Sequence, residues 1–197
     1  MRGLTLNGAG FGANGIVFSG GTKLAIIDCA IANYTAYGIS VNATAHTHVL
    51  ITSTVVSESV GGIVLATNGL GTMTAVLSQL TLDNNTDSIE LIANGGQIAA
   101  DIANSQIGDN SSIGVYSIGA TGQLANEVIL KNVTFSYMPN DVYLAGATNI
   151  YISRVVQSAV APVRVQCINN RNAIFSDVTN HMASILGCSS VGSWVPL

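Results

Sequence analysis

The segments "HVLITSTVVS" at His48–Ser57 and "GIVLA" at Gly62–Ala66 decide the fold. The first has an apolar triplet, a polar turn position and a second apolar pair, and the second is a short apolar run that begins at a glycine. Short β-branched runs bounded by turn residues favour strands over helices. Because both segments recur along the chain, the sequence predicts a repeat protein.

Two sets of apolar anchor residues define the repeat. The anchors are separated by 21–28 residues in both sets, which fits a parallel β-helix and lacks the framework of leucine-rich repeats. We therefore predict an all-β, single-domain, right-handed parallel β-helix (solenoid) of about 7–8 coils over residues 1–197, with a degenerate capping coil at about 171–197. The first set is Leu6, Ile27, Ile51, Leu77, Ile102, Leu130, Ile152 and Phe175, and the second is Ile16, Ile39, Ile63, Ile89, Val115, Val142, Val163 and Ile185.

The composition agrees with this architecture and excludes several classes of protein. Of the 197 residues, 21 are glycine and 3 are proline, and charged residues make up only 8%. With 6 Lys plus Arg and a net charge of −4, the chain has no basic patch that would bind nucleic acid. No apolar run approaches about 18 residues and no signal peptide is recognisable, so we expect no membrane partner.

A family resemblance rests on "RGLTLNGAGFGANGIVFSGG" at Arg2–Gly21 followed by "LAIIDCAIANYTAYGISV" at Leu24–Val41. Over residues 2 to about 145 the chain resembles the right-handed parallel β-helix (pectate-lyase-like) superfamily, and more narrowly the uncharacterised β-helix repeat proteins of bacteria. The resemblance implies an extracellular or cell-surface location and a polysaccharide as partner. Its motifs specify coil geometry rather than any one activity.

An outward-facing column offers a candidate binding strip. The residues that follow the second anchors should point to solvent, and on consecutive coils they include Glu90, Tyr116, Tyr143 and Arg164. Tyrosine rings stack on the apolar faces of sugars, and the flanking charges can bind hydroxyls or uronates. The alternative is an ordinary surface ladder that binds nothing.

Catalytic residues cannot be assigned, and only weak candidates exist. Glu90 and Asp141 are the nearest approach to a glycosidase pair, and Arg164 is the one base candidate for a lyase that uses Ca²⁺. We expect no other cofactor. A serine triad of Asp177, His181 and Ser184 lacks the supporting glycine motif.

Two further pairs of residues are candidates for metal binding and for a disulfide. His46 and His48 share one face of an extended segment and could chelate a metal ion, or they could be solvated loop residues. Cys167 and Cys188 fall on adjacent coils, where a disulfide between them or two free thiols are both compatible with the spacing.

Three functions follow from these observations. We expect an extracellular-type module that binds glycan or acts as a scaffold. The alternatives are a carbohydrate-active enzyme (polysaccharide lyase, glycoside hydrolase or carbohydrate esterase) and the structural trimeric stem of a tailspike. Because no cap is recognisable before the first coil, we also expect a homo-oligomer or an end-to-end contact through that coil.

Overall fold

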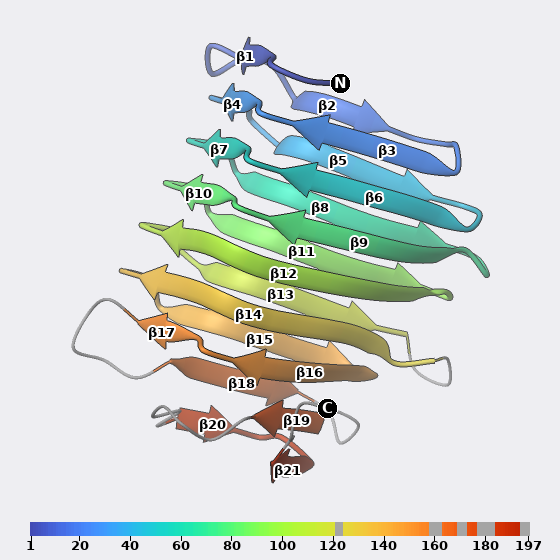
Figure 1. The fold of residues 1–197 in the computed structure, drawn as a ribbon, viewed down its shortest axis with the longest axis vertical. Coiled ribbons are helices and arrows are strands. Elements are labelled where there is room, and N and C mark those ends of the chain that lie inside the picture. Colours follow the sequence, from blue (N-terminus) through green and yellow to red (C-terminus); the bar gives the residue numbers. More distant parts are fainter. Residues whose placement is uncertain (121–123, 158–162, 169–172, 177–183, 194–197) are drawn as a thin grey trace.

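The computed structural model describes residues 1–120, 124–157, 163–168, 173–176 and 184–193, and in these segments the chain winds into a solenoid of parallel strands. Figure 1 shows the strands stacked along the long axis of the molecule, from β1 to β21. The described residues form no helix, and every strand pairs in parallel with strands of neighbouring coils. The prediction of an all-β parallel β-helix is confirmed, while its right-handed winding stays a prediction.

One side of the solenoid is a sheet of eight strands. Each coil contributes one strand to this sheet, and the anchors predicted there pair in register from Ile16 through Ile39, Ile63, Ile89 and Val115 to Val142. The strands, in spatial order, are β2 (Asn14–Phe18), β5 (Tyr37–Ala43), β8 (Gly61–Asn68), β11 (Asp87–Asn94), β13 (Ile113–Gly119), β15 (Asn140–Gly146), β18 (Arg164–Ile168) and β20 (Ser184–Leu186).

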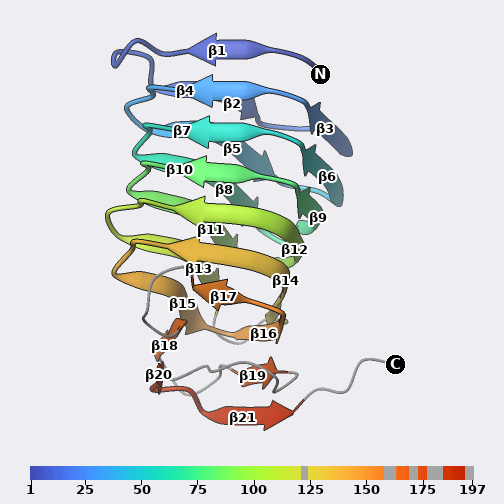
Figure 2. The same cartoon turned by 60° about the vertical axis from the view of Figure 1, so that its left-hand side comes forward.

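The remaining strands form a bent sheet of thirteen. Its longer arm contains β3 (Lys23–Ile27), β6 (Thr47–Thr52), β9 (Thr72–Ser78), β12 (Gln97–Gly108), β14 (Asn126–Ser136), β16 (Thr148–Ser153), β19 (Ala173–Ser176) and β21 (Ser190–Ser193). Its shorter arm contains β1 (Thr5–Asn7), β4 (Ala30–Ala32), β7 (Val55–Ser57), β10 (Thr81–Asp83) and β17 (Val156–Gln157), together with the ends of β12 and β14. Figure 2 shows β1, β4, β7 and β10 stacked as a separate face.

Left-handed residues make the bend between the two arms. Ser53 follows β6 with a φ of 51°, and the equivalent residue of each neighbouring coil also has a positive φ. Asn and Asp tolerate this conformation because their short side chains bond locally, and Asn33, Asn84 and Asp109, which follow strands of the shorter arm, also have a positive φ. The bend residues are Asp28, Ser53, Gln79, Asn104, Asn132 and Arg154.

The first set of predicted anchors needs three corrections. Leu6 pairs with Ile31 and so belongs to the shorter arm rather than the longer one. Ile26, which is fully buried, and not Ile27 pairs with Ile51. Phe175 pairs with Tyr151 rather than Ile152. Runs of consecutive isoleucines and valines hide one-residue shifts, because either neighbour looks like a core residue.

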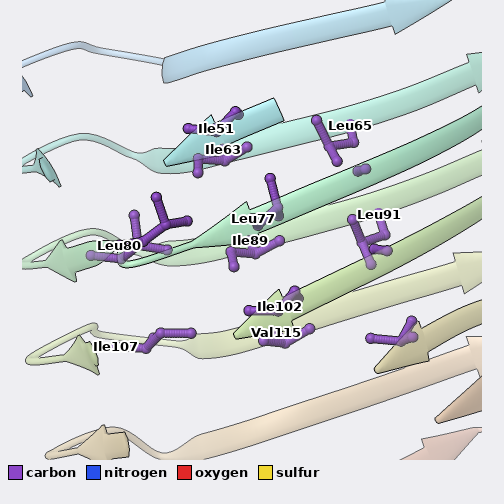
Figure 3. Close-up of a cluster of buried hydrophobic side chains, with 14 of the residues drawn as sticks. Ile51, Ile63, Leu65, Leu77, Leu80, Ile89, Leu91, Ile102, Ile107 and Val115 are labelled. Atoms are coloured by element: carbon purple, nitrogen blue, oxygen red, sulfur yellow. The ribbon is translucent and has the colours of Figure 1, made fainter. Parts of the chain in front are cut away.

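The core is a narrow stack of aliphatic side chains between the sheets. Figure 3 shows Ile51, Leu77 and Ile102 from the longer arm opposite Ile63, Ile89 and Val115 from the sheet of eight. All six are fully buried. Replacing one of the isoleucines or Leu77 by alanine in such a packed interior costs about 2–5 kcal/mol. This rigid core holds the outward-facing columns at fixed spacing.

Candidate functional site

The outer face of the sheet of eight presents Glu90, Tyr116 and Tyr143 on three consecutive coils. Glu90 pairs with Tyr116, and Tyr116 pairs with Tyr143, so the register places these residues side by side. The rings of Tyr116 and Tyr143 lie edge to face, with centroids 5.4 Å apart and planes inclined at 60°. Both rings are half-buried, and each leaves part of its surface open to solvent. We call Glu90, Tyr116 and Tyr143 the tyrosine strip.

Arg164 does not belong to this strip. Val165, rather than Val163, pairs with Val142, so Gln166 stands beside Tyr143. The Arg164 guanidinium instead donates from Nη1 to the carbonyl of Pro139 at 2.8 Å. The sequence prediction was wrong by two residues because such a shift preserves the alternation of buried and exposed positions.

Tyr37 extends the strip from a second outward column. Gly61 pairs with Tyr37 on one side and with Asp87 on the other, and the Tyr37 ring covers Gly61, where any added Cβ would clash with it. The Tyr37 hydroxyl donates to Oε2 of Glu90 at 3.4 Å, although Glu90 is two coils away. The glycine makes room for the ring, so a glycine beside a tyrosine on the next coil was the signal that sequence reasoning missed.

The electrostatics of the strip are acidic. Burial raises the pKa of the Glu90 carboxyl above its ordinary value, the charge of Asp87 raises it further, and the Tyr37 hydroxyl opposes the shift. Burial also raises the pKa of Tyr116, with contributions from Tyr143, Glu90 and Asp87. Asp87 accepts a hydrogen bond from the backbone N–H of Ile113 at 3.0 Å, which fixes its position. The strip and the neighbouring Asp87 therefore combine aromatic surface with two carboxyl groups.

Asp141 lies in the wall of the solenoid and not on this face. It is completely buried, and its Oδ2 accepts the backbone N–H of Arg164 at 2.7 Å. Burial raises the pKa of Asp141, while the backbone hydrogen bond and the charge of Arg164 lower it. The equivalent residue two coils earlier is Ser88, and Gly114 lies between them. Asp141 and Glu90 therefore do not face a common substrate as an acid–base pair.

A corner groove of about 740 Å³ runs beside Glu58, Asn85 and Asp109. The buried side-chain amide of Asn85 forms hydrogen bonds with backbone groups. Its Oδ1 accepts from the N–H of Ser59 at 3.1 Å, and its Nδ2 donates to the carbonyl of Val56 at 3.0 Å. The N–H of Asn85 in turn donates to Asn110 Oδ1 at 2.9 Å. This asparagine ladder fastens one coil to the next and is structural.

The other predicted site residues lie elsewhere. His46 and His48 come together at the start of β6, on the longer arm of the bent sheet. Within the described segments, no group of three or more His, Cys, Asp or Glu residues could hold a metal ion. Cys167 and Cys188 form a disulfide with a Cα–Cα distance of 4.9 Å, and Cys29 is a buried free thiol. Of the serine triad, Asp177 and His181 lie outside the described residues.

Comparisons with protein-family models, with curated proteins and with solved structures found no match to this chain. In the segments that the structure describes, no helix has the length and apolar character needed to cross a membrane. The fold and the geometry of the tyrosine strip are thus the observations on which a function can be proposed.

Proposed function

We propose that this protein is a β-helix module that binds a polysaccharide along the tyrosine strip without cleaving it. One observation carries the proposal: Tyr116 and Tyr143 stand on adjacent coils with ring centroids 5.4 Å apart, beside the half-buried Glu90. Aromatic rings supply large contact areas with little loss of conformational entropy, and their hydroxyls bind polar groups. The stacked coils supply the rigid scaffold.

The strip suits a neutral glycan or one that carries amino groups. Asp87 and Glu90 are the charged residues on this part of the sheet. Arg164, the cation that could have paired with a uronate, lies outside the strip. Like charges placed opposite one another disfavour binding, so polyuronates should bind weakly. Ionised Glu90 can accept hydrogen bonds from sugar hydroxyls or pair with an ammonium group.

We further propose an extracellular location and membership of the pectate-lyase-like superfamily of bacterial β-helix proteins. The parallel solenoid supports this membership, because proteins of that superfamily are built from stacked coils of this type. The Cys167–Cys188 disulfide supports an oxidising compartment, because disulfides persist mainly outside the reducing cytosol. A trimeric stem has less support, because Asp101 interrupts the apolar column of Leu50, Val76 and Ile129 on the opposite face.

A glycan array tests the proposal. The wild-type protein and the Tyr116→Ala/Tyr143→Ala double variant are applied to neutral, amino-sugar and polyuronate oligosaccharides, with and without Ca²⁺. We expect the wild type to bind neutral or amino-sugar chains and the double variant to lose that binding. Equal binding by both proteins would place the site elsewhere. Release of shortened or unsaturated products would favour the enzyme alternatives.

A further inference from the structure

We propose that His46 and His48 form a binding site for one divalent transition-metal ion. Both imidazoles are exposed on the same side of the chain at the start of β6. Their Nε2 atoms lie 3.1 Å apart, and the ring planes are nearly perpendicular at 88°. Two ring nitrogens thus lie within 3.1 Å of each other on an exposed part of the chain. The site is separate from the tyrosine strip, which lies on the other sheet.

The distance between the nitrogens fits a chelate. Two imidazole nitrogens, each about 2.0–2.1 Å from a metal ion, are about 2.8–3.4 Å apart for ligand angles between 90° and the tetrahedral value. The observed 3.1 Å falls inside this range. The same separation allows one Nε2–H to donate to the other nitrogen, so a metal ion would replace that proton. Because the ion would lie off the line that joins the two nitrogens, both rings would turn so that their lone pairs point to it.

Thr72 of β9 orients one of the two ligands. His46 Nδ1 lies 2.5 Å from Thr72 Oγ1, and Thr47 pairs with Met73, which places Thr72 on the coil next to His46. When Nδ1–H donates to this hydroxyl, the proton is held on Nδ1 and the lone pair of Nε2 points outward. Outer-shell partners of this kind fix the tautomer of metal-binding histidines.

The surroundings limit which ion can bind. Imidazole ligands suit Cu²⁺, Ni²⁺ and Zn²⁺, whereas Ca²⁺ and Mg²⁺ prefer oxygen ligands. With two protein ligands, the remaining coordination positions go to solvent. Lys23 pairs with His48 on the preceding coil, and its positive charge opposes a cation. We therefore expect a labile site of moderate affinity, strongest for Cu²⁺ by the usual order of divalent ions.

Calorimetric titration of the untagged protein with Cu²⁺, Ni²⁺ and Zn²⁺ tests this site. We expect one ion per chain and tightest binding for Cu²⁺. His46→Ala and His48→Ala should each weaken binding by about 100-fold, because the second ligand no longer binds intramolecularly. Thr72→Val should weaken it by about tenfold through lost orientation. Lys23→Gln should tighten it, and His181→Ala, which changes the third histidine of the chain, should leave it unchanged.

Electron paramagnetic resonance supplies an independent measurement. With one equivalent of Cu²⁺, the wild type should show coupling to two imidazole nitrogens, and each histidine variant should show coupling to one. Because both side chains are exposed, the variants should unfold at the wild-type urea concentration, which separates loss of the site from loss of the fold. Unchanged Cu²⁺ affinity in both variants, or no coupling to two nitrogens in the wild type, would overturn the proposal.

Discussion

The hydroxyl of Tyr37 reaches across one whole coil to donate to Glu90 Oε2 at 3.4 Å. This bond favours the ionised carboxylate, while burial and Asp87 favour the neutral acid, so the charge of Glu90 depends on a balance of nearby groups. Since Glu90 lies in the same strip as the two tyrosines, this balance determines whether a sugar bound there contacts a neutral or an ionised carboxyl group.

Tyr37→Phe should raise the pKa of Glu90. The substitution keeps the ring over Gly61 but removes the donor that stabilises the carboxylate. A carbon-13 NMR titration of the Glu90 carboxyl in both proteins measures the shift. An unchanged or lower pKa in the variant would mean that the hydrogen bond is not formed in solution.

The free energy of unfolding should fall as the pH rises from about 4 to neutrality. The pKa values of Glu90, Asp83 and Asp141 are all raised in the folded protein, with burial as the largest cause. Such carboxyls add stability that is fully present below the unfolded pKa and is lost as the pH rises through the folded value.

Glu90→Gln should weaken this dependence, because the amide does not ionise. Urea unfolding between about pH 4 and 7 provides the measurement. Asp101→Asn, at an exposed position on the opposite sheet, is the control and should keep the wild-type slope. A wild-type protein whose stability rises with pH over this window would contradict the assignment.

Asn85→Ala should destabilise the fold by about 3 kcal/mol. The side chain is 2% exposed, and its loss leaves the N–H of Ser59 and the carbonyl of Val56 without their partner. Asn68→Ala breaks the exposed Asn68–Asn42 bond of 2.7 Å and should cost less than about 0.5 kcal/mol. Equal urea midpoints for the two variants would show that the buried ladder contributes nothing.

Cys188→Ser should cost about 3 kcal/mol, since the disulfide closes a loop with a sequence separation of 21 residues. The loss should appear first in hydrogen exchange of β18 and β20, which flank the bridge. In denaturant, the unreduced wild type should expose one reactive thiol, that of Cys29, and the reduced protein three. Three reactive thiols before reduction would show that the bridge is absent.

The sequence was sufficient to predict the solenoid and the sheet of eight. Inward anchors such as Ile63 and Ile89 recur once per coil, and a parallel ladder stacks equivalent positions, so Glu90, Tyr116 and Tyr143 could be placed together. The third face could not be predicted. A polar turn position was recognisable within "HVLITSTVVS", but nothing in the pattern shows that the chain bends at Ser53 so that Val55–Ser57 forms a strand on a face of its own.

Side-chain contacts between coils also could not be predicted from the sequence pattern. The position of Arg164 depends on a two-residue shift that the alternation of side chains cannot reveal. The bond between Tyr37 and Glu90 depends on the open space above Gly61, which is visible only when three coils are stacked. The spacing of His46 and His48 indicated that they share one face, but it gave no sign of the contact between His46 and Thr72.

Calorimetric titration with the glycan selected on the array tests the central claim most directly, using Tyr116→Ala, Tyr143→Ala and Tyr151→Ala. Tyr151 lies on the opposite sheet, and burial, together with the charge of nearby Glu127, raises its pKa, so it is a matched control. We predict that each strip variant binds at least about tenfold more weakly than the wild type and that Tyr151→Ala binds equally well. Wild-type affinity in both strip variants, or an equal loss in Tyr151→Ala, would contradict the account.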